Sequence, residues 1–315
     1  MEISEIFSTQ LPVGEKFSIK RTRFSPTNPK KNQKRISIIT GIHGDELEGQ
    51  FVVFLLVEWL RKNQDKIKGI IDLYPAVNPL GIDSITRSFP MYEVDLNRAF
   101  PGDAKSFLPS HLVYELSQDV QGSDIAIDIH SSNIFLKEIP QIRINKQFSE
   151  TIALAKELNC DFIWVHDAVT VLEATFSHTM NELGTKTLVV EMGVGMALTQ
   201  KYGYQLLDGI LNLMKKEGII QTDEIYEIRK PFTSEVGDVY FINAQASGLF
   251  IQEIKHCEVI KKGDKIGKIV DPLTGTIKCE VVAPNKGILF TLREFPVVYE
   301  GSLIARIFGE KDEEG

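Results

Sequence analysis

Residues 35–63 read RISIITGIHGDELEGQFVVFLLVEWLRKN, and this stretch decides the fold class. It opens with a β-branched apolar run at 36–40, which predicts a buried strand. A glycine-bearing turn follows, and from 45 to 63 the apolar residues recur with helical spacing. A strand that passes directly into a helix is typical of a sheet covered by helices, so we expect an α/β fold.

The same alternation continues outward to about residue 221. It predicts strands at 36–40, 69–74, 124–129, 141–144, 162–165 and 187–191, and helices at 45–63, 111–120, 148–158 and 204–216. Beyond about residue 224 the segments shorten and are separated by glycine and proline, which predicts a small all-β barrel or sandwich. We therefore expect a larger α/β domain at 1–224 and a smaller C-terminal all-β domain at 225–315.

Composition excludes several classes of protein. The chain has 315 residues, 43% hydrophobic and 25% charged, which is a globular mixture and not a disordered one. Its 35 Lys and Arg against 43 Asp and Glu give a net charge of −8, which disfavours nucleic-acid binding. The apolar run at 51–57 is far shorter than the ~20 residues of a membrane span, and the start MEISEIFSTQ lacks the features of a secretion signal. We expect a cytoplasmic protein without a membrane partner.

The three cysteines, Cys160, Cys257 and Cys279, show no paired spacing. This argues against a disulfide framework and against a thiolate zinc site. Any metal ion would therefore need histidine and carboxylate ligands.

The turn GIHGDELEG at 41–49 contains the first candidate ligands. His43 and Glu46 are three residues apart, a spacing that can bring an imidazole nitrogen and a carboxylate oxygen to one metal ion. In open α/β sheets, ligands bind beyond the carboxyl ends of the strands, which is where this turn lies. The alternative is that Asp45 and Glu46 only favour the helix dipole and that His43 is a surface residue.

A second strand ends in the same way, because the apolar run at 125–129 is followed by His130, Ser131 and Ser132. Two strand ends then supply two histidines and one glutamate. Such a set leaves a fourth position open for water, as in catalytic zinc sites, where the ion lowers the pKa of water to ~7 and polarises a carbonyl. The alternative is a hydrogen-bonded core histidine.

Glu191 ends a third apolar strand, just before Met192 and Gly193. A carboxylate there is costly unless it is paired, bound to a metal or sharing a proton. We interpret Glu191 as a general base that takes a proton from the attacking water and passes it to the leaving amine. The alternatives are a helix-terminal acid and a salt bridge. Arg87 and Arg98 belong to the intervening segment at 87–102 and suit an anionic substrate or an oxyanion.

Together the motifs GIHGDELEG, DLNRAFPG, DIHSS and VVEMG resemble the succinylglutamate desuccinylase/aspartoacylase family, which shares its fold with zinc carboxypeptidases. The resemblance spans about 36–195 by motif, and the later β segment is similar to the family's C-terminal domain. It implies a zinc-carboxypeptidase-like mixed sheet flanked by helices, with a catalytic domain at 1–224 that binds one Zn²⁺. It also implies roles for seven residues: His43, Glu46 and His130 as zinc ligands, Glu191 as general base and acid, Asn97 and Arg98 as substrate-binding residues, and Arg87 as the oxyanion-stabilising residue. Asp95 and Asp128 lie inside the motifs and are candidates for orienting the ligands.

One position departs from the family pattern. Aspartoacylases place an arginine about ten residues before the catalytic glutamate to bind the substrate's α-carboxylate, but here that position is Asn181. No arginine occurs between Arg143 and Arg229, and His178 or Lys186 is left as a possible substitute.

The C-terminal segment resembles biotinyl and lipoyl carrier folds, in which a lysine at a hairpin tip is modified. The corresponding turn, DPLTG at 271–275, contains no lysine. We therefore expect an unmodified barrel that shapes the mouth of the active site or makes an oligomer contact, so a homo-oligomer is one possibility.

These observations predict a zinc-dependent amidohydrolase that acts on a small N-acyl amino acid or a related N-acyl amine. A carboxypeptidase-like metallopeptidase and a non-catalytic metal- or ligand-binding module are the alternatives. A serine hydrolase using Ser131 or Ser132 is disfavoured, because a histidine that binds a metal cannot also act as a free base.

Overall fold

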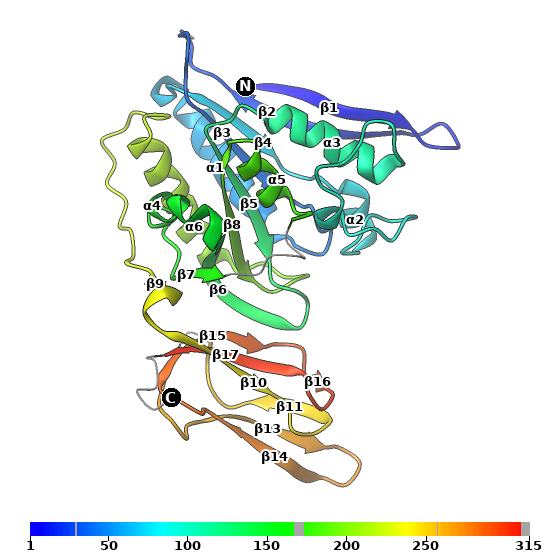
Figure 1. The fold of residues 1–315 in the computed structure, drawn as a ribbon, viewed down its shortest axis with the longest axis vertical. Coiled ribbons are helices and arrows are strands. Elements are labelled where there is room, and N and C mark those ends of the chain that lie inside the picture. Colours follow the sequence, from blue (N-terminus) through cyan, green and yellow to red (C-terminus); the bar gives the residue numbers. More distant parts are fainter. Residues whose placement is uncertain (29, 167–172, 257, 310–315) are drawn as a thin grey trace.

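The structure is a computed structural model that describes residues 1–28, 30–166, 173–256 and 258–309. A large mixed sheet runs through it (Figure 1), with the strand order β1-β2-β4-β3-β5-β8-β6-β15-β17-β10. The bounds of these strands are β1 Glu2–Gln10, β2 Lys16–Phe24, β4 Ile70–Tyr74, β3 Arg35–Thr40, β5 Ile125–Ser131, β8 Lys186–Gly193, β6 Leu136–Asn145, β15 Gly287–Arg293, β17 Leu303–Gly309 and β10 Asp238–Asn243. Three short strands extend it at the side: β7 (Phe162–His166), β9 (Phe232–Thr233) and β12 (Val259–Ile260).

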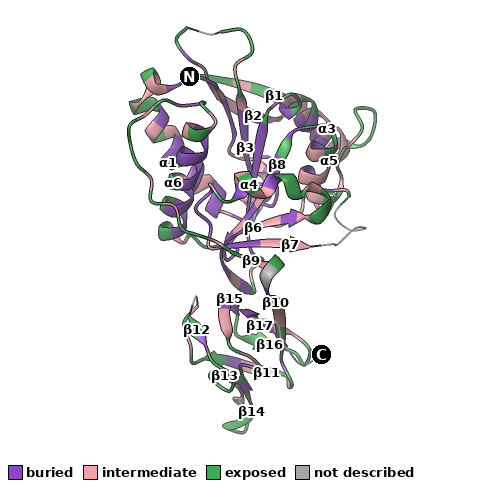
Figure 2. Ribbon diagram, turned by 60° about the vertical axis from the view of Figure 1, so that its left-hand side comes forward, coloured by how far each residue is buried: buried purple, intermediate pink, exposed green. Residues whose placement is uncertain are grey.

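Helices cover both faces of the central strands, as the alternating pattern predicts (Figure 2). On one face, α1 (Glu48–Lys62) and α6 (Gln200–Lys216) pack through Leu56 and Leu206 onto Ile38 and Ile127. On the other, α3 (Leu108–Val120) and α5 (Phe176–Glu182) pack onto Ile39 and Ala126. Neighbouring strand residues thus enter different cores because successive side chains of a strand point to opposite faces. The α/β fold class is confirmed.

All six predicted strands of the first 221 residues are present. Several of them run further than expected. β6 begins at Leu136, β5 continues to Ser131 and β8 continues to Gly193, so His130 and Glu191 lie within their strands. Helix α1 begins at Glu48 and not at residue 45, which leaves Glu46 in the preceding turn.

The helix predicted at 148–158 is present only in part. This segment forms a 3-10 helix at Lys146–Thr151 and a single α-helical turn, α4, at Ile152–Ala155. The Asn145 side chain accepts a hydrogen bond from the Gln147 amide, and Phe148 has non-helical backbone angles. The Asn145 side chain thus caps the start of the 3-10 helix, whereas the backbone angles at Phe148 interrupt the helical path.

The C-terminal strands join the large sheet through β15, which pairs antiparallel with β6. The remaining ones form a four-stranded sheet with the order β14-β13-β11-β16, at Thr276–Val282, Lys265–Asp271, Gly248–Gln252 and Val297–Val298. After α6, the described residues contain strands and one 3-10 turn (Ser234–Val236) but no α-helix, in agreement with the all-β prediction. The expected division at residue 224/225 remains a prediction.

Two further findings bear on the sequence analysis. Among the described residues, no helix is both long enough and apolar enough to cross a lipid bilayer. Cys160 and Cys279 are free thiols, and Cys257 lies outside the described residues.

The turn between β3 and α1 is seated on the first turn of helix α2 (Pro79–Ser84). Gly44 faces that turn so closely that an added Cβ would overlap the backbone of Gly81 and Ile82. The Asn78 side chain in turn caps α2 by accepting a hydrogen bond from the Gly81 amide at 2.9 Å. The position of His43 and Glu46 therefore depends on the absence of a side chain at residue 44.

We expect Gly44→Ala to displace this turn, because a Cβ that meets rigid backbone forces one of the two segments to move. Metal affinity should fall by at least tenfold and the free energy of unfolding by about 1–3 kcal/mol. Metal titration and chemical denaturation measure the two effects.

Gly14→Ala is the control. Gly14 has φ +97° and open space around it, so alanine should cost about 1 kcal/mol of backbone strain without loss of metal affinity. Equal metal affinity in Gly44→Ala and wild type would contradict the prediction.

Candidate functional site

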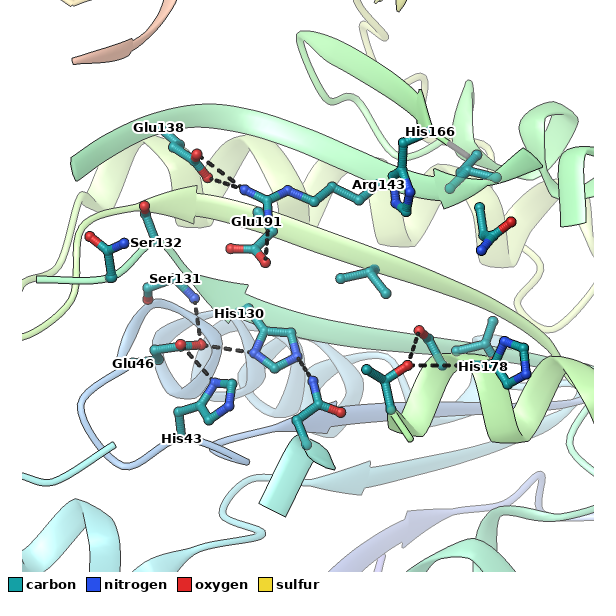
Figure 3. Close-up of a pocket in the computed structure, with 18 of the residues that line it drawn as sticks. His43, Glu46, His130, Ser131, Ser132, Glu138, Arg143, His166, His178 and Glu191 are labelled. Atoms are coloured by element: carbon teal, nitrogen blue, oxygen red, sulfur yellow. Dashed lines mark hydrogen bonds and ion pairs between the residues drawn. The ribbon is translucent and has the colours of Figure 1, made fainter. Parts of the chain in front are cut away.

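Three adjacent parallel strands carry the predicted site residues to one edge of the sheet. β3 pairs with β5 so that Thr40 lies opposite Ile129, and β5 pairs with β8 so that His130 lies opposite Glu191. The turn after β3 brings His43 and Glu46 to the same edge, as Figure 3 shows. Parallel strands end together at one edge, and this is the usual place for ligand sites in such sheets.

Glu46 joins the two histidines. Its Oε1 lies 2.7 Å from His43 Nδ1, and its Oε2 lies 2.8 Å from His130 Nδ1. The Ser131 amide also donates to Oε2 at 3.1 Å. All three side chains are at least 95% buried, and one ligand atom from each lies within 4.8 Å of the others. Among the described residues, this is the one group of three or more such side chains close enough to share an ion.

The outer nitrogens of both imidazoles face carboxylates. His43 Nε2 is 2.9 Å from Asp95 Oδ1, and His130 Nε2 is 2.9 Å from Asp128 Oδ2. A carboxylate behind a histidine fixes the ring and leaves the opposite nitrogen to bind a metal ion. Asp95 and Asp128 are therefore placed as the sequence suggested.

The cluster is rich in negative charge. Burial opposes the charged form of His43 and His130, but Glu46, Asp95 and Asp128 outweigh it and raise both histidine pKa values. Burial likewise opposes the charged form of Glu46, yet the two imidazoles hold its pKa well below the ordinary range. Surroundings of this kind favour a bound cation.

The residues present fit a metal ion. His43 Nδ1 is buried and forms no hydrogen bond, although it points at Glu46. Two imidazole nitrogens and a carboxylate oxygen are a donor set that suits zinc and several other divalent ions. A metal-binding site at His43, Glu46 and His130 is thus possible in this structure.

Arg87, Asn97 and Arg98 all line the same pocket. Arg87 Nη1 donates to Glu46 Oε1 at 2.8 Å, and Arg87 Nη2 donates to Asp95 Oδ2 at 3.4 Å. Asn97 Nδ2 is 3.5 Å from His130 Nε2, while Asn97 Oδ1 accepts from the Phe176 amide. Arg98 lies beside Asn97 and donates to its carbonyl oxygen at 2.7 Å.

Glu191 faces the pocket from β8 and pairs with an arginine that the sequence analysis left without a role. Arg143 Nη1 lies 3.2 Å from Glu191 Oε1. Burial is the main reason that the pKa of Glu191 is raised; Arg143 opposes that rise and Glu138 adds to it. A glutamate with a raised pKa is a better proton acceptor than an exposed glutamate.

The pocket has a volume of about 380 Å³ and extends from His43, Glu46 and His130 towards His166 and His178 (Figure 3). Asn181 also lines the pocket, but its side-chain amide is already hydrogen-bonded. Asn181 Nδ2 donates to the carbonyl oxygens of Ser177 and Thr187, and Asn181 Oδ1 accepts from the Thr187 amide. Asn181 therefore cannot replace the family's arginine as an anion-binding group. Of the two suggested substitutes, His178 lines the pocket, whereas Lys186 is exposed at the start of β8 and does not.

Sequence reasoning missed two pocket arginines, Arg143 on β6 and Arg306 on β17. The available signal was a charged residue inside an otherwise apolar strand. Such a residue also fits an edge salt bridge, so the signal alone does not point to the pocket.

Comparison with known proteins agrees with this geometry. Residues 32–216 match the model of the succinylglutamate desuccinylase/aspartoacylase catalytic domain. The N-alpha-acetyl-L-2,4-diaminobutyric acid deacetylase of Halomonas elongata is 24% identical over 288 residues, which is 88% of this chain and 83% of the relative. Mouse aspartoacylase is 38% identical over 68 residues, which is 21% of this chain and 20% of that protein.

Solved structures share the fold over nearly the whole chain. The product-bound ectoine utilization protein EutE (DoeB) from Ruegeria pomeroyi superposes with a TM-score of 0.77 at 18% identity, covering 96% of this chain and 92% of that one. A succinylglutamate desuccinylase/aspartoacylase from Rhodobacter sphaeroides gives 0.78 at 20% identity, covering 99% and 96%. Because the family model matches more than half of its residues, this chain belongs to the succinylglutamate desuccinylase/aspartoacylase family.

Proposed function

We propose that the chain is a zinc-dependent amidohydrolase that removes the acyl group from a small N-acyl amino acid or a related N-acyl amine. One observation carries the proposal: two imidazole Nδ1 atoms lie against the two oxygens of Glu46, in the same pocket as Glu191, a half-buried glutamate on β8. The deacetylase of Halomonas elongata, named for a small N-acetylated amino acid, supports the substrate class.

In this proposal His43, Glu46 and His130 hold the ion. Zinc in such a site lowers the pKa of water and polarises a carbonyl. Asp95 and Asp128 keep the two imidazoles oriented, since each contacts the ring nitrogen that faces away from Glu46.

The other pocket residues perform the proton transfer and bind the substrate. Glu191 takes a proton from the attacking water and returns it to the leaving nitrogen, so the same carboxyl serves first as base and then as acid. Arg87 stabilises the negative charge that develops on the carbonyl oxygen, and Asn97 and Arg98 bind an acceptor-rich group of the substrate.

Glu191→Gln should lower kcat by about 10²–10⁴-fold, because the amide cannot accept the proton. Zinc content should stay at the wild-type value, because Glu191 is not one of the three ligands. Metal analysis and release of acetate or another acyl product, over a panel of N-acyl amino acids and N-acyl diamines, measure the two quantities.

Glu58, an exposed glutamate that pairs with Lys62, provides a matched control. Glu58→Gln on α1 makes the same chemical change far from the pocket and should leave kcat intact. Full activity in Glu191→Gln would refute the role given to Glu191. Cleavage of short peptides in place of N-acyl compounds would favour the carboxypeptidase-like alternative.

Removal of the metal should abolish acyl release, and added zinc should restore it. His130→Ala should lose at least tenfold in metal affinity, because it removes one of three ligands. Activity that persists after dialysis against a chelator, with no residual metal by mass spectrometry, would exclude the proposed mechanism.

The pH dependence follows from the raised pKa of Glu191. The base acts only when it is deprotonated, so kcat/KM is lost as the pH falls through that pKa. Because burial raises the pKa of Glu191, the loss should begin at a higher pH than the ~4.3 of an exposed glutamate allows. A pH–rate profile tests this, and an acidic limb centred at or below pH ~4 would contradict it.

A further inference from the structure

Four charged side chains form a row that connects the C-terminal strands to Glu191. Arg306 Nη1 on β17 donates to Glu138 Oε1 on β6 at 2.7 Å. Arg143 Nη2, also on β6, donates to Glu138 Oε2 at 2.9 Å, and Arg143 Nη1 lies 3.2 Å from Glu191 Oε1. We call Arg306, Glu138, Arg143 and Glu191 the ion-pair chain. Its two positive and two negative groups alternate, so the charges balance.

An irregularity in β6 makes this arrangement possible. Residues five apart in a regular strand point to opposite faces, so Glu138 and Arg143 would not meet. The pairing of β6 with β8 shifts register between Glu138 and Gln141, as a β-bulge does. Beyond that shift both side chains point to the pocket, where Figure 3 shows them in contact.

The arginines of the ion-pair chain are also held by an aromatic ring. The guanidinium carbons of Arg143 and Arg306 lie 5.6 and 5.4 Å from the centre of the Trp164 ring, and Arg306 lies 5.5 Å from that of Phe241. Glu138 is only 1% exposed. Planar guanidinium groups that are both stacked and hydrogen-bonded have few alternative positions.

Folding stability alone does not explain why these charged side chains are buried together. Buried ion pairs are often no more stabilising than apolar side chains of similar volume. Arg143 is moreover unsuited to bind a substrate anion, because both of its terminal nitrogens already face carboxylates of the protein. What remains for Arg143 is to act on Glu191.

We propose that Arg306, Glu138 and Arg143 are positioning residues that orient the Glu191 carboxylate, so that the C-terminal strands set the geometry of the general base. This inference rests on the proposed function of Glu191. Arg306 holds Glu138 in place and partly neutralises its negative charge. Glu138 can then hold Arg143 without drawing the Arg143 guanidinium away from Glu191. Without Arg306, the full charge of Glu138 competes with Glu191 for the Arg143 guanidinium.

Arg306→Met tests the first link, because methionine keeps an apolar stem against Trp164 and Phe241 but lacks the charge. With Nα-acetyl-L-2,4-diaminobutyrate as substrate, or the panel compound that the wild type hydrolyses fastest, kcat should fall about tenfold while KM stays within about twofold. Zinc content should not change. A crystal structure of the zinc-loaded variant should show Arg143 more than ~4 Å from Glu191, beyond ion-pair distance.

The order of the ion-pair chain is tested by a double-mutant cycle. If Arg306 acts only through Glu138, Arg306→Met should have no further effect on kcat in the Glu138→Gln background. Independent effects that multiply would overturn the proposal, as would wild-type kcat in Arg306→Met.

Arg293→Met is the matched control. Arg293 is a buried arginine of the same C-terminal strands, but its guanidinium donates to the backbone carbonyls of Phe295, Val297 and Leu303. This variant should lose stability and keep kcat. An equal loss of kcat in Arg306→Met and Arg293→Met would overturn the proposal, because the loss would then follow from lower stability alone. If the wild type itself shows no metal-dependent deacylation, the proposed function fails, whereas an active wild type with an equally active Arg306→Met fails only this inference.

Discussion

The site depends on the register of three parallel strands, β3, β5 and β8, whose carboxyl ends meet at one edge of the sheet. Backbone hydrogen bonds hold neighbouring strands ~4.8 Å apart, so side chains at adjacent strand ends are within reach of a single ion. The Glu46 carboxylate then contacts one imidazole with each oxygen. A slip of β5 by one residue would turn His130 to the other face and separate it from Glu46.

The buried carboxylates around Glu46 oppose folding, and the same negative charge favours the binding of a cation. Glu46 and Asp128 are almost fully buried, and burying a carboxylate is costly unless it is paired. The histidines and Arg87 supply part of the pairing. A divalent cation would complete the pairing, and its binding free energy would offset the unfavourable free energy of bringing these carboxylates together. The donors are then already oriented before substrate arrives.

Much of the site could be predicted because its residues follow local signals. Each of His43, His130 and Glu191 comes at or just after the end of an apolar run, and the strand ends of an α/β sheet converge. The prediction was met only in part at 148–158, where the apolar spacing fits one continuous helix. The segment is a 3-10 helix followed by the single α-helical turn α4, and Phe148 takes non-helical backbone angles within it. Periodicity does not register such a local break in the backbone.

By itself, then, the sequence determined the fold class and the residues His43, Glu46, His130 and Glu191 that meet in one pocket, since these depend on residue type and position along each strand. The tertiary structure alone decided that Arg143 and Arg306 also reach the pocket. Arg143 and Arg306 meet Glu138 through the pairing of β6 with β8 and of β15 with β6 and β17, together with a register shift in β6. Those contacts join segments far apart in the chain, and long-range strand pairing leaves no periodic trace in the sequence around either arginine.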